Sequence, residues 1–332
     1  MFMNKFSKNK LEAVAKQIDD KRVSFNEALA PHSWMKVGGP ADLFFVATSA
    51  DDLKLAVKAA FAHGVSYTVL GGGSNVLIKD GGIRGLVIKN RAEKISLAGV
   101  TGKREGSSMD VSGAVVKAES GVVVNQLVRY TIEESLAGLE EFLGIPGTVG
   151  GAVFNNSHHL DHLIGDYISE VGVVNEAGEE IVYKNSEMGF DYDDSRLQGT
   201  KEVVLWAKFS LIKGDKKQLW QLAEAALRRR RDTQPLEMPS SGCMFKNIGK
   251  ANAIRFNTPN GATGAGFLID QAGLKGLKQG KAMVSDKHAN FIINTGGASA
   301  KDVMKLSELV FKKVKDKYGV QMQKEVFFIG ED

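Results

Sequence analysis

The chain has 332 residues, 43% of them hydrophobic and 25% charged, which is enough for about two domains with ordinary cores and excludes disordered, collagen-like and low-complexity classes. Its net charge of +4 gives little reason to expect a nucleic-acid partner, and its single cysteine, Cys243, excludes an intrachain disulfide. The N-terminus is too polar for a signal peptide and no apolar run approaches the length of a membrane span, so we expect a cytoplasmic enzyme without membrane insertion.

The first predicted elements alternate between helices and strands. The apolar spacing predicts a helix at 11–18 and a strand at 41–46. A second helix begins after the N-cap Ser49, and strands follow at 65–70 and 76–78 on the two sides of a glycine-rich loop. This part of the chain is therefore predicted to be an α/β unit.

Strands dominate the middle of the chain, and a long helix lies near its end. A polar stretch at 101–109 divides the strand-like segment 95–118 and predicts a surface hairpin. The other predicted elements are a helix at 120–134, strands at 171–174, 180–183 and 203–211, helices at 216–231 and 300–317, and a last strand at 324–329. We expect a domain boundary near 213, with the last strand returning to the first domain.

The segment Gly71-Gly72-Gly73-Ser74-Asn75 follows a predicted buried strand. Three glycines allow positive φ angles and expose consecutive backbone N–H groups, which can surround a diphosphate, while Ser74 and Asn75 add side-chain donors. The pattern is not GxGxxG and no helix follows at once, so it does not predict a Rossmann fold. A plain tight turn is the other interpretation.

A second glycine-rich segment, 144–152, contains four glycines and no polar spacer. This composition indicates backbone packed against something flat, either a ligand or a neighbouring helix and strand. Two such loops in one domain favour one extended ligand, such as a dinucleotide.

The third segment, 234–247, has two prolines and a glycine that predict a turn, with Cys243 directly after it. A lone cysteine beside Met244 and Phe245 has two interpretations, an inert core thiol or a catalytic group.

In this order the motifs resemble the UDP-N-acetylenolpyruvoylglucosamine reductase family. The resemblance begins at 33–42 (SWMKVGGPAD), continues through the three segments above, and extends to 266–276, 285–291 and 324–330. It covers about residues 25–330. The chain has no insertion for an extra tyrosine loop and is therefore similar to the shorter-form members.

The resemblance implies an α+β fold, with a two-lobed FAD-binding domain of the vanillyl-alcohol-oxidase (PCMH) type and a C-terminal α+β substrate-binding domain. The implied division is an N-terminal helix at 1–24, the FAD-binding domain at 25–213, the substrate-binding domain at 214–317, and a C-terminal strand at 318–332 that returns to the active site. It also implies NADPH-dependent reduction of UDP-N-acetyl-enolpyruvoylglucosamine, a small UDP-sugar enolpyruvyl ether, to UDP-N-acetylmuramate in peptidoglycan precursor synthesis.

The resemblance further assigns ligand-binding residues. FAD, expected to be non-covalent because neither loop contains a histidine, would contact Gly71, Gly72, Gly73, Ser74, Asn75, Gly147, Thr148, Gly150 and Gly151. NADPH is the expected co-substrate. The residues expected to bind the substrate near its diphosphate are Asn247, Lys246 and Arg231.

The implied chemistry sets requirements for the catalytic residues. Negative charge develops beside the substrate carboxylate, so cations or hydrogen-bond donors are needed there, together with a positioned acid. Relatives have a serine or a cysteine at the position of Cys243, and a thiol, whose ordinary pKa is about 8.5, stays mostly protonated near neutral pH. We therefore expect Cys243 to give the proton and Glu325 to act on the developing enol. An exposed strand glutamate is the other interpretation of Glu325.

Two segments depart from the family's pattern. Asp193 stands where relatives have the arginine that holds the substrate carboxylate. We expect Arg196 to replace that arginine, because a helical turn over 192–196 would bring positions 193 and 196 to one face. The second departure, Asn155-Asn156-Ser157-His158-His159, stands where relatives have Asn-Ala-Gly-Ala beside the flavin; its histidines suggest a metal, but we expect a polar loop and no metal.

Two other functions stay open at this point. An FAD oxidase or dehydrogenase of the same superfamily would share the glycine loops, although the segments 234–247 and 285–291 favour the reductase. A degenerate flavin-binding protein is suggested by Asp193.

Overall fold

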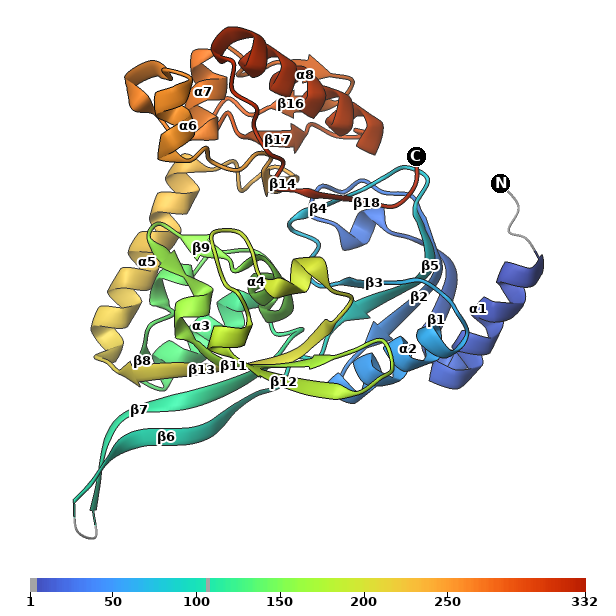
Figure 1. Cartoon of the computed structure of the whole chain (residues 1–332), viewed down its shortest axis with the longest axis vertical. Coiled ribbons are helices and arrows are strands. Elements are labelled where there is room, and N and C mark those ends of the chain that lie inside the picture. Colours follow the sequence, from blue (N-terminus) through green and yellow to red (C-terminus); the bar gives the residue numbers. More distant parts are fainter. Residues whose placement is uncertain (1–4, 106–107) are drawn as a thin grey trace. The chain divides into compact units, whose positions relative to one another are not determined.

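The computed structural model describes residues 5–105 and 108–332, which form two compact units. The first unit contains the described residues up to Asn26, Asp42–Gly72 and Gly85–Arg229. The second unit contains Glu27–Ala41, Gly73–Arg84 and Arg230–Asp332. Helices and mostly antiparallel strands occur in the chain (Figure 1), so the predicted α+β class is confirmed.

The chain passes from the first unit to the second for the last time between Arg229 and Arg230, inside helix α5 (Lys216–Thr233). We expected a boundary near 213, before this helix. The difference has a physical reason, because Leu219 and Ala223 of α5 are buried in the hydrophobic core of the first unit.

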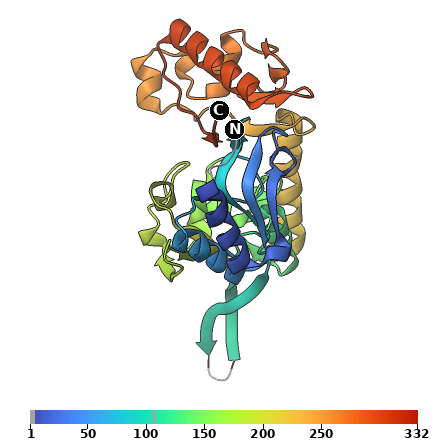
Figure 2. The same ribbon diagram turned by 90° about the vertical axis from the view of Figure 1, so that its right-hand side faces the viewer.

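The N-terminal part of the first unit contains a four-stranded sheet. Its strand order is β1 (Val23–Ala28), β2 (Pro40–Ala47), β5 (Ile83–Asn90) and β3 (Tyr67–Leu70). Helices α1 (Lys5–Ile18) and α2 (Ala50–Ala62) lie side by side in Figure 2. Phe45 of β2 and Leu53 of α2 are fully buried in the core that these elements share. The predicted helices and strands of this region are confirmed, with α1 beginning before residue 11.

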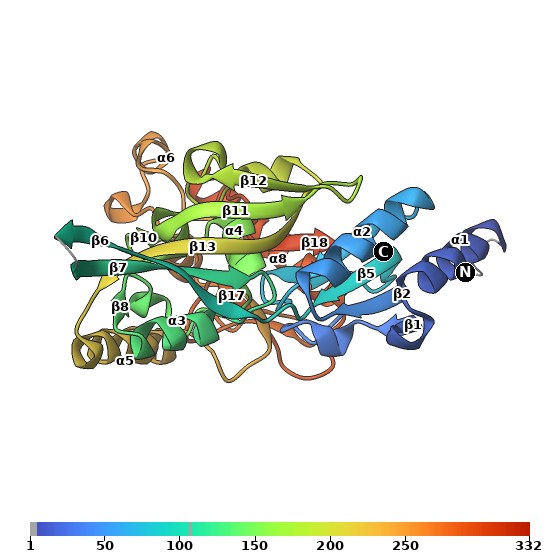
Figure 3. The ribbon, with the colours of Figure 1, turned by 90° about the horizontal axis from the view of Figure 1, so that it is seen from below.

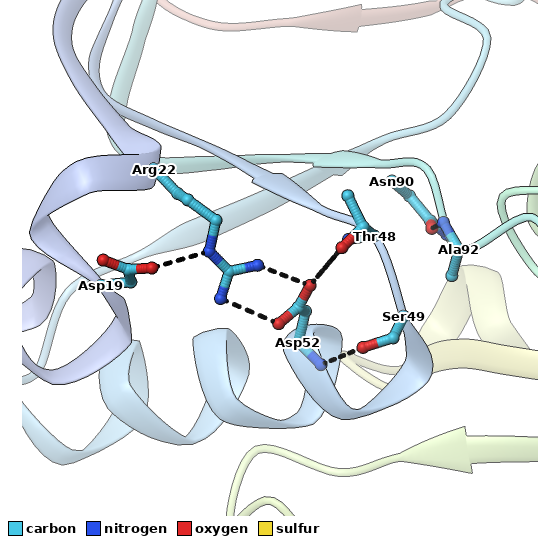
Figure 4. Close-up of polar contacts among 7 residues, drawn as sticks. All are labelled: Asp19, Arg22, Thr48, Ser49, Asp52, Asn90 and Ala92. Carbon is cyan, nitrogen blue, oxygen red and sulfur yellow. Dashed lines mark hydrogen bonds and ion pairs between the residues drawn. The ribbon is translucent and has the colours of Figure 1, made fainter.

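A polar network joins the start of α2 to the turn after α1 (Figure 4). The Ser49 hydroxyl accepts a hydrogen bond from the Asp52 N–H at 3.1 Å, which confirms the predicted N-cap. The Asp52 carboxylate accepts from both terminal nitrogens of Arg22, at 2.9 and 3.1 Å, and from the Thr48 N–H at 2.8 Å. Arg22 also donates to Asp19 at 2.9 Å. The network therefore ties the turn that contains Arg22 to the first turn of α2.

The larger sheet of the first unit is antiparallel (Figure 3). Its order is β12 (Glu180–Lys184), β11 (Ile168–Val174), β13 (Val203–Lys213), β7 (Ser108–Glu119) and β6 (Ile95–Glu105), with β8 (Leu136–Ala137) also paired to β13. The core of this part contains residues of α3 (Val124–Glu133), α4 (Val149–Asn155) and α5, such as Leu127, Val149 and Leu219.

The predicted hairpin is present, but its strands are longer than expected. β6 and β7 stay paired through most of the predicted loop 101–109, and residues 106–107 of that loop lie outside the described residues. Figures 1 and 2 show this hairpin extending beyond the rest of its sheet.

The second unit has a four-stranded sheet with the order β14 (Ser240–Cys243), β17 (Phe291–Asn294), β16 (Ala282–Val284) and β15 (Lys278–Gln279). Its helices are α6 (Lys250–Arg255), α7 (Ala265–Gln271) and α8 (Ala300–Tyr318). The last predicted strand is shorter than expected: β18 (Phe327–Ile329) pairs in parallel with β4 (Val76–Ile78). The chain between Gly73 and Arg84 therefore packs with the C-terminal residues of the same unit.

Short elements complete the described fold. The short strands are β9 (His158–His159) and β10 (His162–Leu163), and the 3₁₀ helices are η1 (Asp20–Arg22), η2 (Ala30–His32), η3 (Glu140–Phe142), η4 (Ile164–Tyr167), η5 (Asn185–Glu187), η6 (Arg196–Gly199) and η7 (Pro259–Gly261). Within residues 5–105 and 108–332, none of the helices combines the length and hydrophobicity that a membrane crossing requires.

Candidate active site

The two glycine-rich loops touch each other in the first unit. A Cβ atom on Gly72 would lie 2.8 Å from the Cα of Gly147, and one on Gly71 would lie 2.4 Å from the Oγ1 of Thr148. Both distances are shorter than real Cβ contacts. At Gly72 the neighbouring atom belongs to the Gly147 backbone, so the close approach of the two loops requires glycine there, whereas at Gly71 the neighbouring atom belongs to the Thr148 side chain. The Lys89 ammonium donates to the Gly71 carbonyl at 2.6 Å and fixes the first loop from the sheet side. The expectation that one ligand contacts both loops is therefore compatible with their positions.

The second loop continues directly into α4, where two more glycines lie. The Gly150 N–H donates to the Ser120 carbonyl at 2.8 Å, and a Cβ on Gly150 would approach the Ser120 Cβ to 3.0 Å. Gly151 differs from Gly150, because it is exposed and the nearest atom to its added Cβ is the Thr148 Oγ1 at 3.9 Å. Packing within the protein explains Gly150 but not Gly151. An exposed helical glycine beside the touching loops leaves backbone open to a bound group, which fits the diphosphate of FAD.

The rest of the first glycine-rich segment belongs to the second unit. Gly73 has a φ of +71°, and its carbonyl accepts from the Trp34 N–H at 2.9 Å. The Asn75 side-chain amide donates to the Glu325 carbonyl at 3.4 Å, and the Asn75 carbonyl accepts from the Phe327 N–H at 3.1 Å. Asn75 thus holds the C-terminal segment that carries Glu325, a contact that the sequence did not predict.

Cys243 and Glu325 are brought together by backbone pairing within the second unit. The Glu325 N–H donates to the carbonyl of Met244 at 3.0 Å, and Phe245 forms an antiparallel bridge with Lys324. Cys243 ends β14, and both Cys243 and Glu325 are half-buried. Partial exposure is what an acid that must reach a substrate requires, whereas the core-thiol interpretation of Cys243 expects full burial.

A cation near Cys243 was not singled out from the sequence. Burial lowers the pKa of the Arg230 guanidinium, and the Cys243 side chain acts against this by favouring the charged guanidinium. Arg230 stays charged at any relevant pH because a guanidinium does not deprotonate in proteins. The basic run at the end of α5 could have indicated a cation here, but helical position alone did not show which of its arginines interacts with Cys243.

The three expected substrate-binding residues lie in the second unit. The Lys246 N–H donates to the Gln323 carbonyl at 2.8 Å, which places Lys246 next to the C-terminal segment. The side-chain oxygen of Asn247 accepts from the Ala265 N–H at 3.0 Å, at the start of α7. Arg231 is exposed at the end of α5, and its carbonyl accepts from the Lys287 ammonium. Substrate binding by these three residues stays a prediction.

The helical turn expected over 192–196 is wrong. Asp193 has a φ of +51°, and Asp191 and Asp194 form an antiparallel bridge, so the chain makes a tight reverse turn there and η6 begins only at Arg196. Asp193 instead pairs with His158, with 2.9 Å between Oδ1 and Nδ1. The reason is a hydrogen bond from a distant part of the chain, because the Asn156 side-chain amide donates to the Asp191 carbonyl at 2.8 Å and holds the turn in this form.

Arg196 is engaged with other residues of the first unit. Its guanidinium lies 3.9 Å from the centre of the Tyr183 ring and 3.8 Å from the Glu202 carboxylate. It also donates to the Glu187 carbonyl at 3.3 Å. The argument from a shared helical face no longer supports Arg196 as the carboxylate ligand, and that role stays a prediction.

The chain matches two family models. Residues 234–329 match the model described as UDP-N-acetylenolpyruvoylglucosamine reductase, C-terminal domain, and residues 41–183 match the model described as FAD binding domain. The match of the first model includes Cys243 and Glu325, and that of the second includes both glycine-rich loops.

Whole-chain relatives agree with these matches. The UDP-N-acetylenolpyruvoylglucosamine reductase of Carboxydothermus hydrogenoformans is 40% identical over 310 residues, covering 92% of this chain and 93% of the relative. That of Clostridium novyi is 36% identical over 324 residues, covering 97% and 96%. The crystal structure of UDP-N-acetylenolpyruvylglucosamine reductase from Thermus caldophilus is similar with a TM-score of 0.70 and 31% identity, covering 93% of this chain and 98% of that chain.

Proposed function

The chain belongs to the UDP-N-acetylenolpyruvoylglucosamine reductase family, and on that premise we propose how its residues carry out the reaction. The protein is an FAD-dependent oxidoreductase that uses NADPH to reduce UDP-N-acetyl-enolpyruvoylglucosamine to UDP-N-acetylmuramate in peptidoglycan precursor synthesis. The single observation that best supports the site is the pairing of the Glu325 N–H with the Met244 carbonyl at 3.0 Å, since it places the expected acid and the expected carboxylate on adjacent backbone.

The glycine-rich loops are the proposed FAD site. When bound, FAD would act as the hydride carrier between NADPH and the methylene carbon of the substrate. Gly71, Gly72, Gly147 and Thr148 form the touching loops, and Gly151 leaves exposed backbone beside them. We propose that these groups, with Gly73, Ser74, Asn75 and Gly150, hold FAD without a covalent bond.

The residues of the protein have two tasks at the enolpyruvyl group of the substrate. They stabilise the negative charge that develops there, and they deliver a proton. Hydride addition makes the adjacent carbon electron-rich, and the reaction ends when a proton is delivered to that carbon. We propose that the Cys243 thiol delivers it. Arg230 favours the thiolate that is left behind, because a nearby cation stabilises an anion in a partly buried site. Glu325 is proposed to act on the enol form of the substrate.

The nucleotide part of the substrate is proposed to bind in the second unit. A diphosphate needs charged and amide donors, and Lys246, Asn247 and Arg231 supply those chemical types. The substrate is a phosphorylated sugar nucleotide, and we propose that the enzyme acts on it in the cytoplasm.

The test is a pair of half-reactions without oxygen. The purified protein is loaded with FAD, reduced with one equivalent of NADPH, and mixed with UDP-N-acetyl-enolpyruvoylglucosamine while the flavin absorbance is followed. Rapid return of the oxidised flavin spectrum, with UDP-N-acetylmuramate as product, is expected. Reoxidation by oxygen alone would instead indicate an oxidase, and no reoxidation by either would indicate a flavin-binding protein without this activity.

A further inference from the structure

We propose that the outer edge of β6 is a site of self-association, where two copies of this chain pair their β6 strands antiparallel about a two-fold axis. The edge belongs to the first unit alone, and its use as an interface is independent of the proposed function. The partner is a second copy of the chain because the exposed apolar residues of β6 are complementary to themselves.

Strand β6 forms one edge of the larger sheet. It ends the strand order, and within the described residues it pairs only with β7. An edge strand leaves a row of backbone N–H and C=O groups unpaired, and another strand can pair with these groups. Residues 97–102 are all exposed, and Figure 1 shows the hairpin of β6 and β7 extending beyond the rest of its sheet. The edge is therefore accessible to a second chain.

The two edges of this sheet differ in sequence. Soluble proteins usually protect an edge strand with charged residues, with proline or by keeping the strand short. At the opposite edge, β12 has only five residues, and it begins and ends with the charged Glu180 and Lys184. In β6 the eight residues 95–102 (ISLAGVTG) include no charged residue and no proline. The edge at β6 is therefore the one suited to pairing with another strand.

Two rows of apolar side chains cross the strands on the face of the sheet that contributes to the core. By strand pairing, the rows are Phe209–Val116–Leu97 and Leu211–Ala114–Val100. The members of both rows on β13 and β7 are at most 5% exposed, whereas Leu97 is 51% exposed and Val100 is 47% exposed. Each row therefore ends at β6 in an apolar side chain that the core does not cover.

A second copy of the chain would continue both rows. Leu97 and Val100 share a face although they are three residues apart, because the pairing with β7 shifts its register between Leu97 and Gly99. An antiparallel pair of β6 strands with Leu97 opposite Val100 is symmetric, since each copy's Leu97 then meets the other copy's Val100. Ala98 and Gly99 lie next to the two-fold axis in this register, and their small size allows close approach. Each row then continues from β13 of one copy to β13 of the other.

The size of this contact determines its strength. A pair of strands of eight residues is about 27 Å long, and we expect it to bury less surface than the roughly 1,600 Å² of a standard stable interface. The dimer should therefore be reversible and should depend on the protein concentration.

The first experiment is sedimentation velocity of the full-length, FAD-loaded protein over a wide range of concentration. We expect a monomer–dimer equilibrium, which Leu97→Lys weakens by about tenfold or more because it buries a charge in an apolar row. Val182→Lys is the matched control, since Val182 is 50% exposed on β12 at the other edge of the same sheet, and it should leave the equilibrium unchanged. Circular dichroism verifies the fold of each variant, and Val100→Lys repeats the test at the second position.

Disulfide cross-linking tests the register. In a Cys243→Ser background, Leu97→Cys protein and Val100→Cys protein are oxidised separately and as a mixture. Residues directly opposite in an antiparallel pair have Cα atoms about 4.5–5.5 Å apart, within reach of a disulfide, whereas the two Leu97 positions would be about 10 Å apart. We therefore expect a covalent dimer from the mixture and little from either protein alone.

Several results would overturn this interface. They are a protein that stays monomeric at every concentration, a dimer that Leu97→Lys and Val100→Lys leave intact, and a dimer that Val182→Lys abolishes. Cross-linking of one cysteine variant alone to the same extent as the mixture would contradict the register and with it the pairing of Leu97 with Val100.

Discussion

Cys243 and Glu325 come from segments far apart in the chain. The environment of each residue is compatible with its proposed role, which is proton delivery for Cys243 and action on the enol for Glu325. Cys243 is half-buried at the end of β14 and interacts electrostatically with the Arg230 guanidinium. Glu325 is held by main-chain and Asn75 contacts that do not use its carboxylate. Single substitutions at these two positions therefore separate proton delivery from cofactor reduction.

At Cys243 we expect Ser to retain measurable turnover and Ala to stop the reaction after flavin reduction. Serine keeps an O–H that can be delivered, whereas alanine has no proton, and removing such an acid costs about 10²–10⁴-fold in rate. Stopped-flow measurement of both half-reactions checks this. The first half-reaction serves as the internal control, because NADPH needs no protein acid to reduce FAD. Normal turnover by the alanine variant would return Cys243 to a packing role.

Glu325→Gln should slow flavin reoxidation by substrate while FAD binding and reduction by NADPH stay close to those of the parent. The amide keeps the shape of the side chain and removes its charge, so the backbone pairing with Met244 is preserved. The same stopped-flow traces measure both rates. Equal damage to the two half-reactions would show that Glu325 supports the fold and not the chemistry.

At the scale of secondary-structure elements, the start of α2 is stabilised by charge. Burial alone would raise the pKa of Asp52, but hydrogen bonds from Arg22 and Thr48 outweigh it and leave this pKa below its usual value. A lowered pKa stabilises the fold above the unfolded value of about 4, and that contribution disappears as the pH falls through the lower, folded value. The network in Figure 4 is therefore an acid-sensitive part of the first unit.

We expect Asp52→Asn to lower the free energy of unfolding at pH 7 by about 1–2 kcal/mol, because the Arg22 partner is partly exposed and screened by solvent. The difference from the parent should shrink as the pH falls below about 4. Urea titrations at several pH values measure this. Ser49→Ala, which removes the neutral cap of the same helix, should cost about 1 kcal/mol at every pH. A difference for Asp52→Asn that does not vary with pH would contradict the charge argument.

Gly151 in α4 provides a test of the cofactor loop. Replacing an exposed helical glycine by alanine raises stability by about 0.5–1 kcal/mol when nothing else is lost. We therefore expect Gly151→Ala to stabilise the FAD-free protein and yet to lower its affinity for FAD, measured by flavin fluorescence. Gly99→Ala in β6 is the matched control, since an added Cβ there meets nothing within 4 Å. Unchanged FAD affinity in Gly151→Ala would remove Gly151 from the proposed site.

At the scale of the whole molecule, the two units are built from interleaved segments. The chain between Gly73 and Arg84 and the chain after Arg229 belong to one unit, and β18 pairs with β4 inside it. Asp80 accepts from the N–H groups of Ala300 and Lys301 at 2.8 and 3.0 Å, which joins these segments at the start of α8. A single cut in the sequence therefore does not separate the units.

A substitution in helix α5 can show whether the two units unfold separately. Leu219 is buried in the core of the first unit, so Leu219→Ala should cost about 2–5 kcal/mol and lower the temperature at which FAD is released on heating. Flavin fluorescence during a thermal ramp measures it. Val303→Ala in α8, buried in the core of the second unit, is the comparison and should affect FAD release less. Equal effects of the two substitutions would mean that the units unfold as one.

Local sequence patterns were sufficient to predict most of the helices and strands and to identify the family. Apolar spacing placed α1, α2 and α8, and the capping residues Ser49 and Ser299 marked two helix starts, because these signals act within one or two turns. The glycine-rich segments identified the candidate FAD loops, since close backbone approach leaves no other choice of residue at Gly72. The order of the motifs along the chain then sufficed to predict the reductase.

Only the tertiary structure decided which partner each side chain meets. Two hydrogen bonds join residues distant in the chain, Asn75 with Glu325 and His158 with Asp193, and Arg230 interacts electrostatically with Cys243. No local spacing encodes such pairs, because they depend on strand pairing and on turns that distant hydrogen bonds hold. The turn at Asp193 illustrates the reason: a helical turn was reasonable from the sequence, but the Asn156 amide stabilises a positive φ there and directs the carboxylate to His158.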